Sequence, residues 1–212
     1  MTRENPVCAP VTGYILAGGA SSRYGSDKAL AKLGGETVLS RMFHLLEGVA
    51  NFVHVVATAE RYPEFRSAMI EDRWPGEGAL GGIITALSAS AGTGGGCEWN
   101  LIVSCDMPFL TGEWLRYMLE QAFTSETDVL FPRSRTGDEP LCACWKRSAL
   151  PVLQRAFDAE VRKVTDAMKR MRVEVLDEAH WKRFDSGGRL FWNMNTQQDY
   201  EEAVRMWRTE NE

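Results

Sequence analysis

Short apolar runs alternate with segments of helical periodicity along most of this chain, and this alternation limits the folds open to it. Apolar runs of strand length occupy residues 11–16, 51–58, 99–105, 128–131, 141–145 and 173–176. Helical periodicity marks residues 36–49, 61–68, 81–91, 111–123, 147–157, 161–171 and 197–208. Such alternation is typical of a mostly parallel sheet that is covered by helices. We therefore expect an α/β three-layer sandwich with helices on both faces of the sheet.

The length and the cysteine content of the chain indicate one ordinary domain. A chain of 212 residues can bury a core without disulfide bonds. We expect a single domain over residues 1–212, with residues 1–10 as a disordered or loosely packed extension. The five cysteines form no CxxC pair, and the chain has only three histidines. From this pattern we expect that the cysteines are reduced and that the protein is cytoplasmic.

The net charge and the apolar runs argue against two classes of partner. With 24 Lys and Arg against 29 Asp and Glu, the formal net charge is -5. The molecule as a whole therefore has no field that attracts nucleic acid or anionic lipid. No apolar run approaches the roughly 18 residues of a membrane span. We expect neither a nucleic-acid nor a membrane partner, and an anionic ligand would need local basic groups.

The stretch LAGGASSRYGSDK, residues 16–28, follows the first predicted strand and precedes the first long helix. Open parallel sheets bind ligands outside the carboxyl ends of their strands. Gly18 and Gly19 let the backbone approach an anion closely, and Arg23 and Lys28 add positive charge. The spacing matches neither a Walker loop nor a GxGxxG fingerprint. We interpret the stretch as a polyphosphate-binding loop, and the alternative is a surface loop with two solvated cations.

A second candidate site is LIVSCDMPFL, residues 101–110, where an apolar strand runs into Asp106 and stops at Pro108. An unpaired carboxylate at the end of a buried strand is costly, so Asp106 needs a partner. Mg2+ suits this role, because it takes one or two carboxylates and completes its coordination with water and phosphate oxygens. The alternative is a turn-forming Asp before a proline loop. Together the two stretches predict a site for a nucleoside triphosphate and its metal.

These residues carry a resemblance to a known family. LAGG at 16–19, Arg23, Gly25 and DKAL at 27–30 resemble the LAGGxSxRMGxDKALL signature of the molybdenum cofactor guanylyltransferases (MobA-like), which have a Rossmann-like nucleotidyltransferase fold. The stretches that resemble later motifs of this family, in the same order, are Glu71-Asp72, PGEGALGGI at 75–83, CDMP at 105–108, Glu139-Pro140-Leu141 and NMNT at 193–196. The resemblance therefore spans nearly the whole chain.

The resemblance implies a reaction and its partners. GMP would pass from GTP to the terminal phosphate of molybdopterin, with Mg2+ as cofactor and pyrophosphate as the leaving group. A molybdenum insertion protein and molybdoenzyme chaperones would be further partners. The pair Gly18-Gly19 favours guanine, because the cytidylyltransferase relatives usually have Ala-Gly there. Such a transfer depends on positioning and charge neutralisation and needs no nucleophilic side chain.

The resemblance also implies roles for individual residues. The residues expected to bind GTP are Leu16, Ala17, Gly18, Gly19, Lys28, Asp72 and Asp106. The residues expected to contact molybdopterin are Gly82, Asn193 and Asn195. Arg23, Lys28 and Asp106 would be catalytic: the two cations would stabilise departing pyrophosphate, and the carboxylate would hold the metal. Asp72 would accept the N1–H and 2-amino protons of guanine. The alternatives are a solvated Asp72 and asparagines that serve only as turn or cap residues.

The stretch 75–83 departs from the family pattern, since Ala79 and Gly81 replace the usual proline and alanine. We expect this stretch to form a mobile loop over the site. Two other functions stay open for the chain as a whole. One is a relative that uses CTP on molybdopterin, or another nucleotide on a sugar phosphate. The other is a catalytically inactive nucleotide-binding module, although the presence of Arg23, Lys28 and Asp106 together argues against it.

Overall fold

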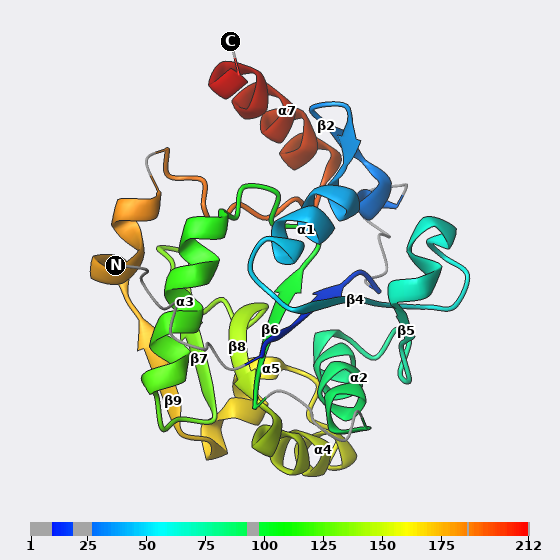
Figure 1. Cartoon of the computed structure of the whole chain (residues 1–212), viewed down its shortest axis with the longest axis vertical. Helices are drawn as coiled ribbons and strands as arrows, with labels where there is room; N and C mark the ends of the chain where they lie inside the picture. Colours follow the sequence, from blue (N-terminus) through cyan, green and yellow to red (C-terminus); the bar gives the residue numbers. More distant parts are fainter. Residues whose placement is uncertain (1–9, 19–26, 93–97, 186, 212) are drawn as a thin grey trace, which may run out of the picture.

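Seven strands form one sheet at the centre of the molecule, in the order β5-β4-β1-β6-β8-β7-β9 (Figure 1). The computed structural model describes residues 10–18, 27–92, 98–185 and 187–211, so residues 1–9 of the predicted extension lie outside the described residues. The strands are β1 (Thr12–Leu16), β4 (Phe52–Ala57), β5 (Met69–Glu71), β6 (Trp99–Ser104), β7 (Val129–Pro132), β8 (Cys142–Lys146) and β9 (Val173–Leu176).

The pairing within the sheet is mostly parallel. β1 pairs in parallel with β4 and with β6, β4 pairs in parallel with β5, and β7 pairs in parallel with β9. Only β8 among these strands runs against its neighbours, β6 and β7. Each of the six apolar runs found in the sequence forms a strand of this sheet. The predicted α/β class with a mostly parallel sheet is therefore confirmed.

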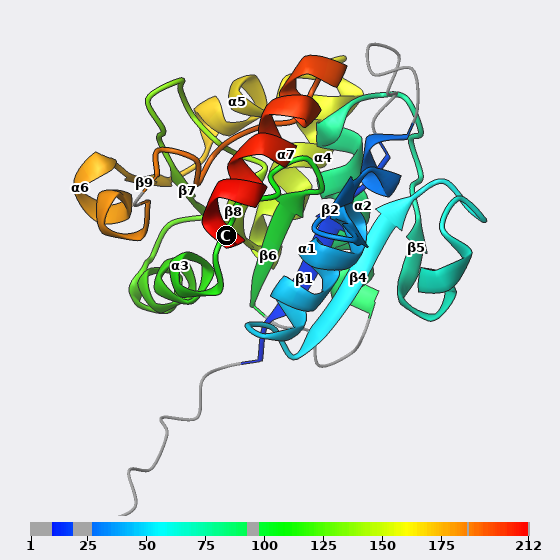
Figure 2. The ribbon, with the colours of Figure 1, turned by 90° about the horizontal axis from the view of Figure 1, so that it is seen from above.

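Helices cover both faces of the sheet (Figure 2). The helices of the described residues are α1 (Val38–Glu47), α2 (Ala79–Gly92), α3 (Gly112–Thr124), α4 (Leu150–Asp158), α5 (Val164–Ala167), α6 (Glu178–Trp181) and α7 (Gln197–Asn211), of which α7 packs against β2. Successive residues of a strand point to opposite faces, so Ile15 joins the buried cluster under α1 and α3, whereas Tyr14 joins the cluster under α2, α4 and α5. Within the described residues, no helix is both long and apolar enough to cross a membrane.

A small hairpin before α1 holds the C-terminal helix. Strands β2 (Lys32–Leu33) and β3 (Glu36–Thr37) pair antiparallel across Gly34 and Gly35, whose φ angles are +64° and +87°. Two positive φ angles define the tight hairpin turn that matches the twist of the strands, and glycine adopts them at little cost. A third buried cluster joins this region to α7, and its members are Leu33, Val38, Phe109, Met194 and Ala203. The sequence patterns did not predict this hairpin.

The predicted helix boundaries need several corrections. The helix expected over 36–49 begins at Val38, because Thr37 accepts a hydrogen bond from the Ser40 N–H and caps it. The helix expected over 61–68 is a 3-10 helix over Pro63–Ala68, the residues Arg147–Ala149 form a 3-10 turn before α4, and 161–171 contains only α5 followed by a 3-10 turn. The prediction of a mobile loop over 75–83 is wrong for the second half of that stretch. There α2 already begins at Ala79, and a Cβ built on Gly81 would lie 3.1 Å from the Trp74 Cβ.

Candidate active site

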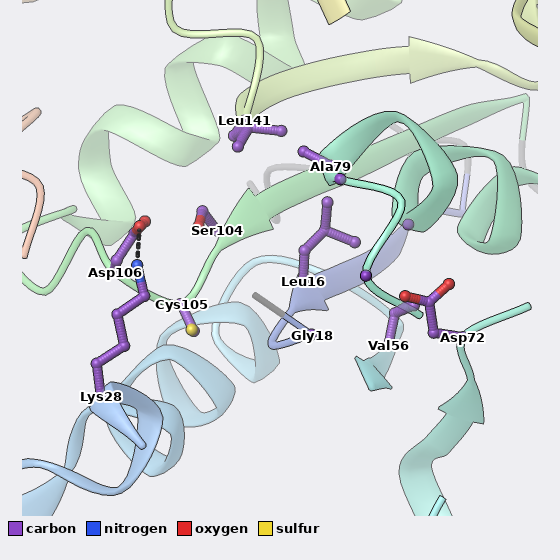
Figure 3. A pocket seen from close by; sticks show the side chains of 13 residues that line it. Leu16, Gly18, Lys28, Val56, Asp72, Ala79, Ser104, Cys105, Asp106 and Leu141 are labelled. Atoms are coloured by element: carbon purple, nitrogen blue, oxygen red, sulfur yellow. Dashed lines mark hydrogen bonds and ion pairs between the residues drawn. The ribbon is translucent and has the colours of Figure 1, made fainter. Parts of the chain in front are cut away.

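A pocket opens where β1, β4 and β6 end (Figure 3). Leu16 pairs with Val56 on one side and with Ser104 on the other, so the three strands end at the same level. The residues predicted from the sequence that line this pocket are Leu16, Gly18, Lys28, Asp72, Gly82 and Asp106. The fold therefore brings residues from four distant motifs to one edge of the sheet, where open parallel sheets bind their ligands.

Lys28 and Asp106 form an ion pair on one side of the pocket. Asp27 caps a 3-10 turn over Lys28–Leu30 by accepting a hydrogen bond from the Ala29 N–H. From this turn, Lys28 Nζ donates to Asp106 Oδ2 at 2.6 Å and to Asn195 Oδ1 at 3.3 Å. The side chains of Lys28 and Asp106 are only 16% and 13% exposed. Water screens such a pair less than it screens a surface pair.

The second carboxylate oxygen of Asp106 gives a test for a metal. Asp106 Oδ1 is buried and has no hydrogen-bond partner within the described part of the chain. A buried carboxylate oxygen without a partner is costly and suits a cation. The same part of the chain contains no cluster of three or more His, Cys, Asp or Glu side chains. Asp106 therefore fits an ion that takes few protein ligands and many water or phosphate oxygens, as Mg2+ does.

Asp72 lies across the pocket from this ion pair, with Leu16 and Gly18 between them (Figure 3). Its Oδ1 accepts hydrogen bonds from the Trp74 N–H at 3.0 Å and from Thr85 Oγ1 at 3.3 Å. Its Oδ2 lies beside Gly18, where an added Cβ would be 3.2 Å away. Asp72 is only 9% exposed, so the alternative of a solvated surface residue is wrong. The carboxylate has a fixed orientation with Oδ2 at the pocket wall.

The amino end of α2 also lines the pocket. Gly76, Gly78 and Ala79 contribute to the wall, and Gly82 lies one turn further along, where an added Cβ would come within 3.3 Å of the Leu16 side chain. The first N–H groups of a helix have no partner inside the helix and carry partial positive charge. These residues belong to the PGEGALGGI stretch, which was expected over the site, but no individual role was predicted for Gly76, Gly78 or Ala79.

Four other residues that were predicted for the site either do not line the pocket or lie outside the described residues. The Ala17 carbonyl accepts a hydrogen bond from the Tyr62 hydroxyl at 3.0 Å, and its side chain is buried. Asn193 Nδ2 donates to the Phe191 carbonyl at 3.1 Å, and Asn193 does not line the pocket. Gly19 and Arg23 lie outside the described residues, so their predicted roles stay predictions.

The start of α7 shows why Asn195 reaches the site. Asp199 Oδ2 accepts hydrogen bonds from the N–H groups of Asn195 and Thr196, while Thr196 Oγ1 accepts from the Asp199 N–H. This reciprocal arrangement caps α7, which begins at Gln197 directly after Thr196. It also fixes the backbone of Asn195, whose side chain accepts the Lys28 hydrogen bond.

Sequence reasoning missed the residues that hold these side chains in place. Thr85 on α2 accepts from the Arg73 N–H and donates to Asp72. Tyr62 and Arg61 both donate to Asp27 Oδ2, at 2.9 Å and 2.8 Å.

Burial raises the pKa of Glu139 above its ordinary value, and the nearby charge of Asp106 raises it further, whereas hydrogen bonds from Ser134 and Thr136 act in the opposite direction.

Comparisons with known proteins show which family the chain is similar to. The model of the family described as MobA-like NTP transferase domain matches residues 13–175. A molybdenum cofactor guanylyltransferase from Desulfosudis oleivorans is 31% identical over 195 residues, which cover 91% of this chain and 94% of that protein. The crystal structure of molybdopterin-guanine dinucleotide biosynthesis protein A from Archaeoglobus fulgidus has a TM-score of 0.78 at 26% identity, and the match covers 93% of this chain and 99% of that chain.

A more distant structure shows the fold alone. The manganese complex of Rv0371c from Mycobacterium tuberculosis H37Rv has a TM-score of 0.64 at 16% identity, over 92% of this chain and 98% of that chain. The family model matches well over half of the residues, and its name agrees with the resemblance found in the sequence motifs. The chain is therefore an enzyme of the nucleotidyltransferase class and belongs to the MobA-like NTP transferase domain family.

Proposed function

We propose that this enzyme transfers GMP from GTP to molybdopterin, which forms the guanine dinucleotide cofactor and releases pyrophosphate. One observation carries the proposal: a single pocket has an oriented carboxylate, Asp72, on one side and the Lys28–Asp106 pair on the other. The first group suits a base that presents adjacent N–H donors, and the second suits a triphosphate with its metal. The name of the relative from Desulfosudis oleivorans supports the same reaction.

Asp72 would select guanine at the base end of the pocket. Guanine presents its N1–H and 2-amino protons side by side, and a carboxylate accepts both, whereas adenine and cytosine lack this arrangement of donors. Hydrogen bonds from Trp74 and Thr85 hold Oδ1, so Oδ2 is the oxygen at the pocket wall. Gly18 and Leu16 would support the nucleoside, because a side chain at position 18 would crowd Asp72 Oδ2.

Lys28 and Asp106 would act at the phosphates. A phosphate oxygen of molybdopterin attacks the α-phosphorus of GTP, and the bond to the bridging oxygen of pyrophosphate breaks. Lys28, together with Arg23, would neutralise the charge on departing pyrophosphate. Asp106 Oδ1 would hold Mg2+, which supplies charge neutralisation at the α-phosphate when bound. No side chain forms a covalent intermediate, since positioning and charge carry the reaction.

The acceptor would enter beside Asn195. This residue contacts Lys28 Nζ and starts the segment that leads into α7, so an acceptor phosphate there would lie next to the lysine. Gly82 and Asn193 are proposed as further contacts of molybdopterin on the strength of the family resemblance. The described cysteines, Cys105, Cys142 and Cys144, are buried and free, which supports our proposal of a cytoplasmic reaction.

The test is pyrophosphate release with Mg2+ and molybdopterin, with GTP, CTP, ATP and UTP offered separately. We expect release with GTP alone, and a fall of roughly 100-fold or more for Lys28→Ala and Asp106→Ala. Lys32→Ala is the matched control, because Lys32 is an exposed lysine four residues away. Release with CTP alone would assign the protein to the cytidylyltransferase relatives. No release with any nucleotide, from folded protein, would favour a nucleotide-binding module.

A further inference from the structure

The hydroxyl of Tyr62 joins the two ends of the glycine-rich stretch. Its oxygen lies 3.0 Å from the Ala17 carbonyl oxygen and 2.9 Å from Asp27 Oδ2, so its single proton is shared between these two acceptors. Ala17 directly follows β1, and Asp27 directly precedes Lys28. Tyr62 itself comes from the segment after β4, and its side chain is fully buried. One hydroxyl thus connects three segments of the chain that are distant in sequence.

The carboxylate of Asp27 is held from several directions. Arg61 Nε donates to Asp27 Oδ2 at 2.8 Å, so this oxygen receives both Arg61 and Tyr62. The Ala29 N–H donates to Oδ1 at 3.1 Å, which closes the 3-10 turn that carries Lys28. The Asp27–Arg61 pair is mostly shielded, with side chains 18% and 28% exposed. The orientation of the turn therefore depends on residues 61 and 62.

We propose that Tyr62 is a positioning residue for nucleotidyl transfer: through Asp27 it fixes the turn that aims Lys28 Nζ at Asp106 and Asn195. This inference rests on the proposed function, in which Lys28 neutralises charge on the transferred phosphates. An ammonium group must reach its target within a fraction of an ångström to do so, and a misplacement of about 1 Å can cost roughly 100-fold in rate.

The chemistry of Tyr62 suits this role over a wide pH range. Burial raises the pKa of the Tyr62 hydroxyl well above its ordinary value, and the negative charge of Asp27 raises it further. The hydroxyl therefore stays protonated and remains a donor. The ring packs in the core beneath α1, so phenylalanine would preserve the packing and remove only the hydroxyl and the proton that it shares between Ala17 and Asp27.

The first test compares the kinetics of Tyr62→Phe with those of the wild-type enzyme. We expect kcat for pyrophosphate release to fall about tenfold, while KM for GTP stays within about twofold, because Asp72 and the base end are unchanged. Tyr200→Phe is the matched control, since its hydroxyl also donates to a backbone carbonyl, that of Lys32, at 2.9 Å. An unchanged kcat in Tyr62→Phe, with a lower melting temperature, would reduce Tyr62 to a structural role and overturn the proposal.

A second test needs no turnover, so it separates this inference from the proposed function. The rate at which an amine-reactive acylating reagent modifies each lysine is followed by mass spectrometry. Lys28 is 16% exposed in its ion pair with Asp106, whereas Lys169 is 74% exposed in its surface pair with Asp166 and serves as the internal control. We expect Tyr62→Phe to raise the rate at Lys28 several-fold and to leave Lys169 unchanged.

The two tests together distinguish the possible failures. Faster modification of Lys28 in a protein that transfers no nucleotide would contradict the proposed function and support the link between Tyr62 and Lys28. Normal transfer by Tyr62→Phe, with unchanged modification of Lys28, would overturn the inference and leave the proposed function intact.

Discussion

At the scale of single residues, three carboxylates near the site have different surroundings and therefore different roles. Asp72 has one oxygen held by two donors, Asp106 has one oxygen paired with Lys28 and one without a partner among the described residues, and Glu139 is buried beside two hydroxyl groups. The first arrangement suits a hydrogen-bond donor, the second suits a metal, and the third favours the protonated acid. Sequence alone shows only that three acidic residues follow strands or turns.

Glu139 predicts a specific pH dependence of stability. Its pKa is raised in the folded state, chiefly by burial, so its contribution to stability is present at low pH and is lost as the pH rises through the folded pKa. At pH 7 this raised pKa therefore costs stability relative to a carboxyl group with an ordinary pKa. Glu139→Gln should raise the melting temperature at pH 7 by up to about 3 °C, equivalent to about 1 kcal/mol, and change it little at pH 4. Thermal unfolding at both pH values checks this, and equal melting temperatures of the two proteins at pH 7 would contradict it.

The sequence was enough to propose residues for the chemistry and to predict that they lie close together, but it did not show the residues that support them. Lys28 and Asp106 belong to recognisable motifs at strand ends, and a parallel sheet brings such ends together. Tyr62 and Thr85 act through hydrogen bonds to residues 10 or more positions away, and no local pattern marks such bonds. In the sequence, Tyr62 is indistinguishable from an ordinary aromatic core residue, and its ring is indeed part of the core.

At the scale of elements, length decided which strands could be predicted. The six predicted strands have four to six residues, whereas β5 has three and β2 and β3 have two each. An apolar pattern can be recognised in a sequence only over about four residues or more. The antiparallel direction of β8 also has no local signal, since strand direction depends on the connection and on the neighbouring strands.

The β2–β3 hairpin gives a prediction with a matched control. Gly34 and Gly35 both have positive φ, but only a Cβ on Gly34 would collide with Trp207 of α7, whereas a Cβ on Gly35 would meet open space. Gly34→Ala should therefore destabilise the protein by about 1–2 kcal/mol more than Gly35→Ala. Chemical denaturation of the two variants measures the difference. Equal losses of stability would mean that the contact with α7 contributes nothing.

At the scale of the whole molecule, the C-terminal helix completes a site that the sheet begins. The third buried cluster packs α7 against the hairpin and the segment after β6, and the cap of α7 fixes Asn195 next to Lys28. Figure 1 shows α7 at one end of the molecule beside β2. Residues near the two ends of the chain thus share one hydrogen bond at the centre of the proposed reaction.

Asn195→Ala tests this long-range contribution. The variant removes the Oδ1 that accepts from Lys28 Nζ, so we expect kcat for pyrophosphate release to fall about tenfold, which corresponds to about 1.4 kcal/mol of transition-state stabilisation. Gln197→Ala, which removes only an exposed contact with Glu201, is the control and should stay within about twofold. A normal rate for Asn195→Ala would show that the C-terminal segment plays no part in the transfer.

The central claim, that Asp72 reads guanine, is tested most directly by comparing GTP with XTP in the wild-type enzyme and in Asp72→Asn. Trp74 and Thr85 both donate to the Oδ1 position, so they would hold the amide oxygen there and leave the NH2 group at the pocket wall. That group would pair with the 2-carbonyl of xanthine and repel the 2-amino group of guanine.

We expect the kcat/KM ratio of GTP to XTP to exceed 10 in the wild-type enzyme and to fall below 1 in Asp72→Asn, a change of at least about 1.4 kcal/mol in discrimination. Glu71→Gln, which alters the exposed neighbouring carboxylate, should keep the wild-type ratio. A GTP to XTP ratio that Asp72→Asn leaves unchanged would contradict the account, because base selection would then lie elsewhere.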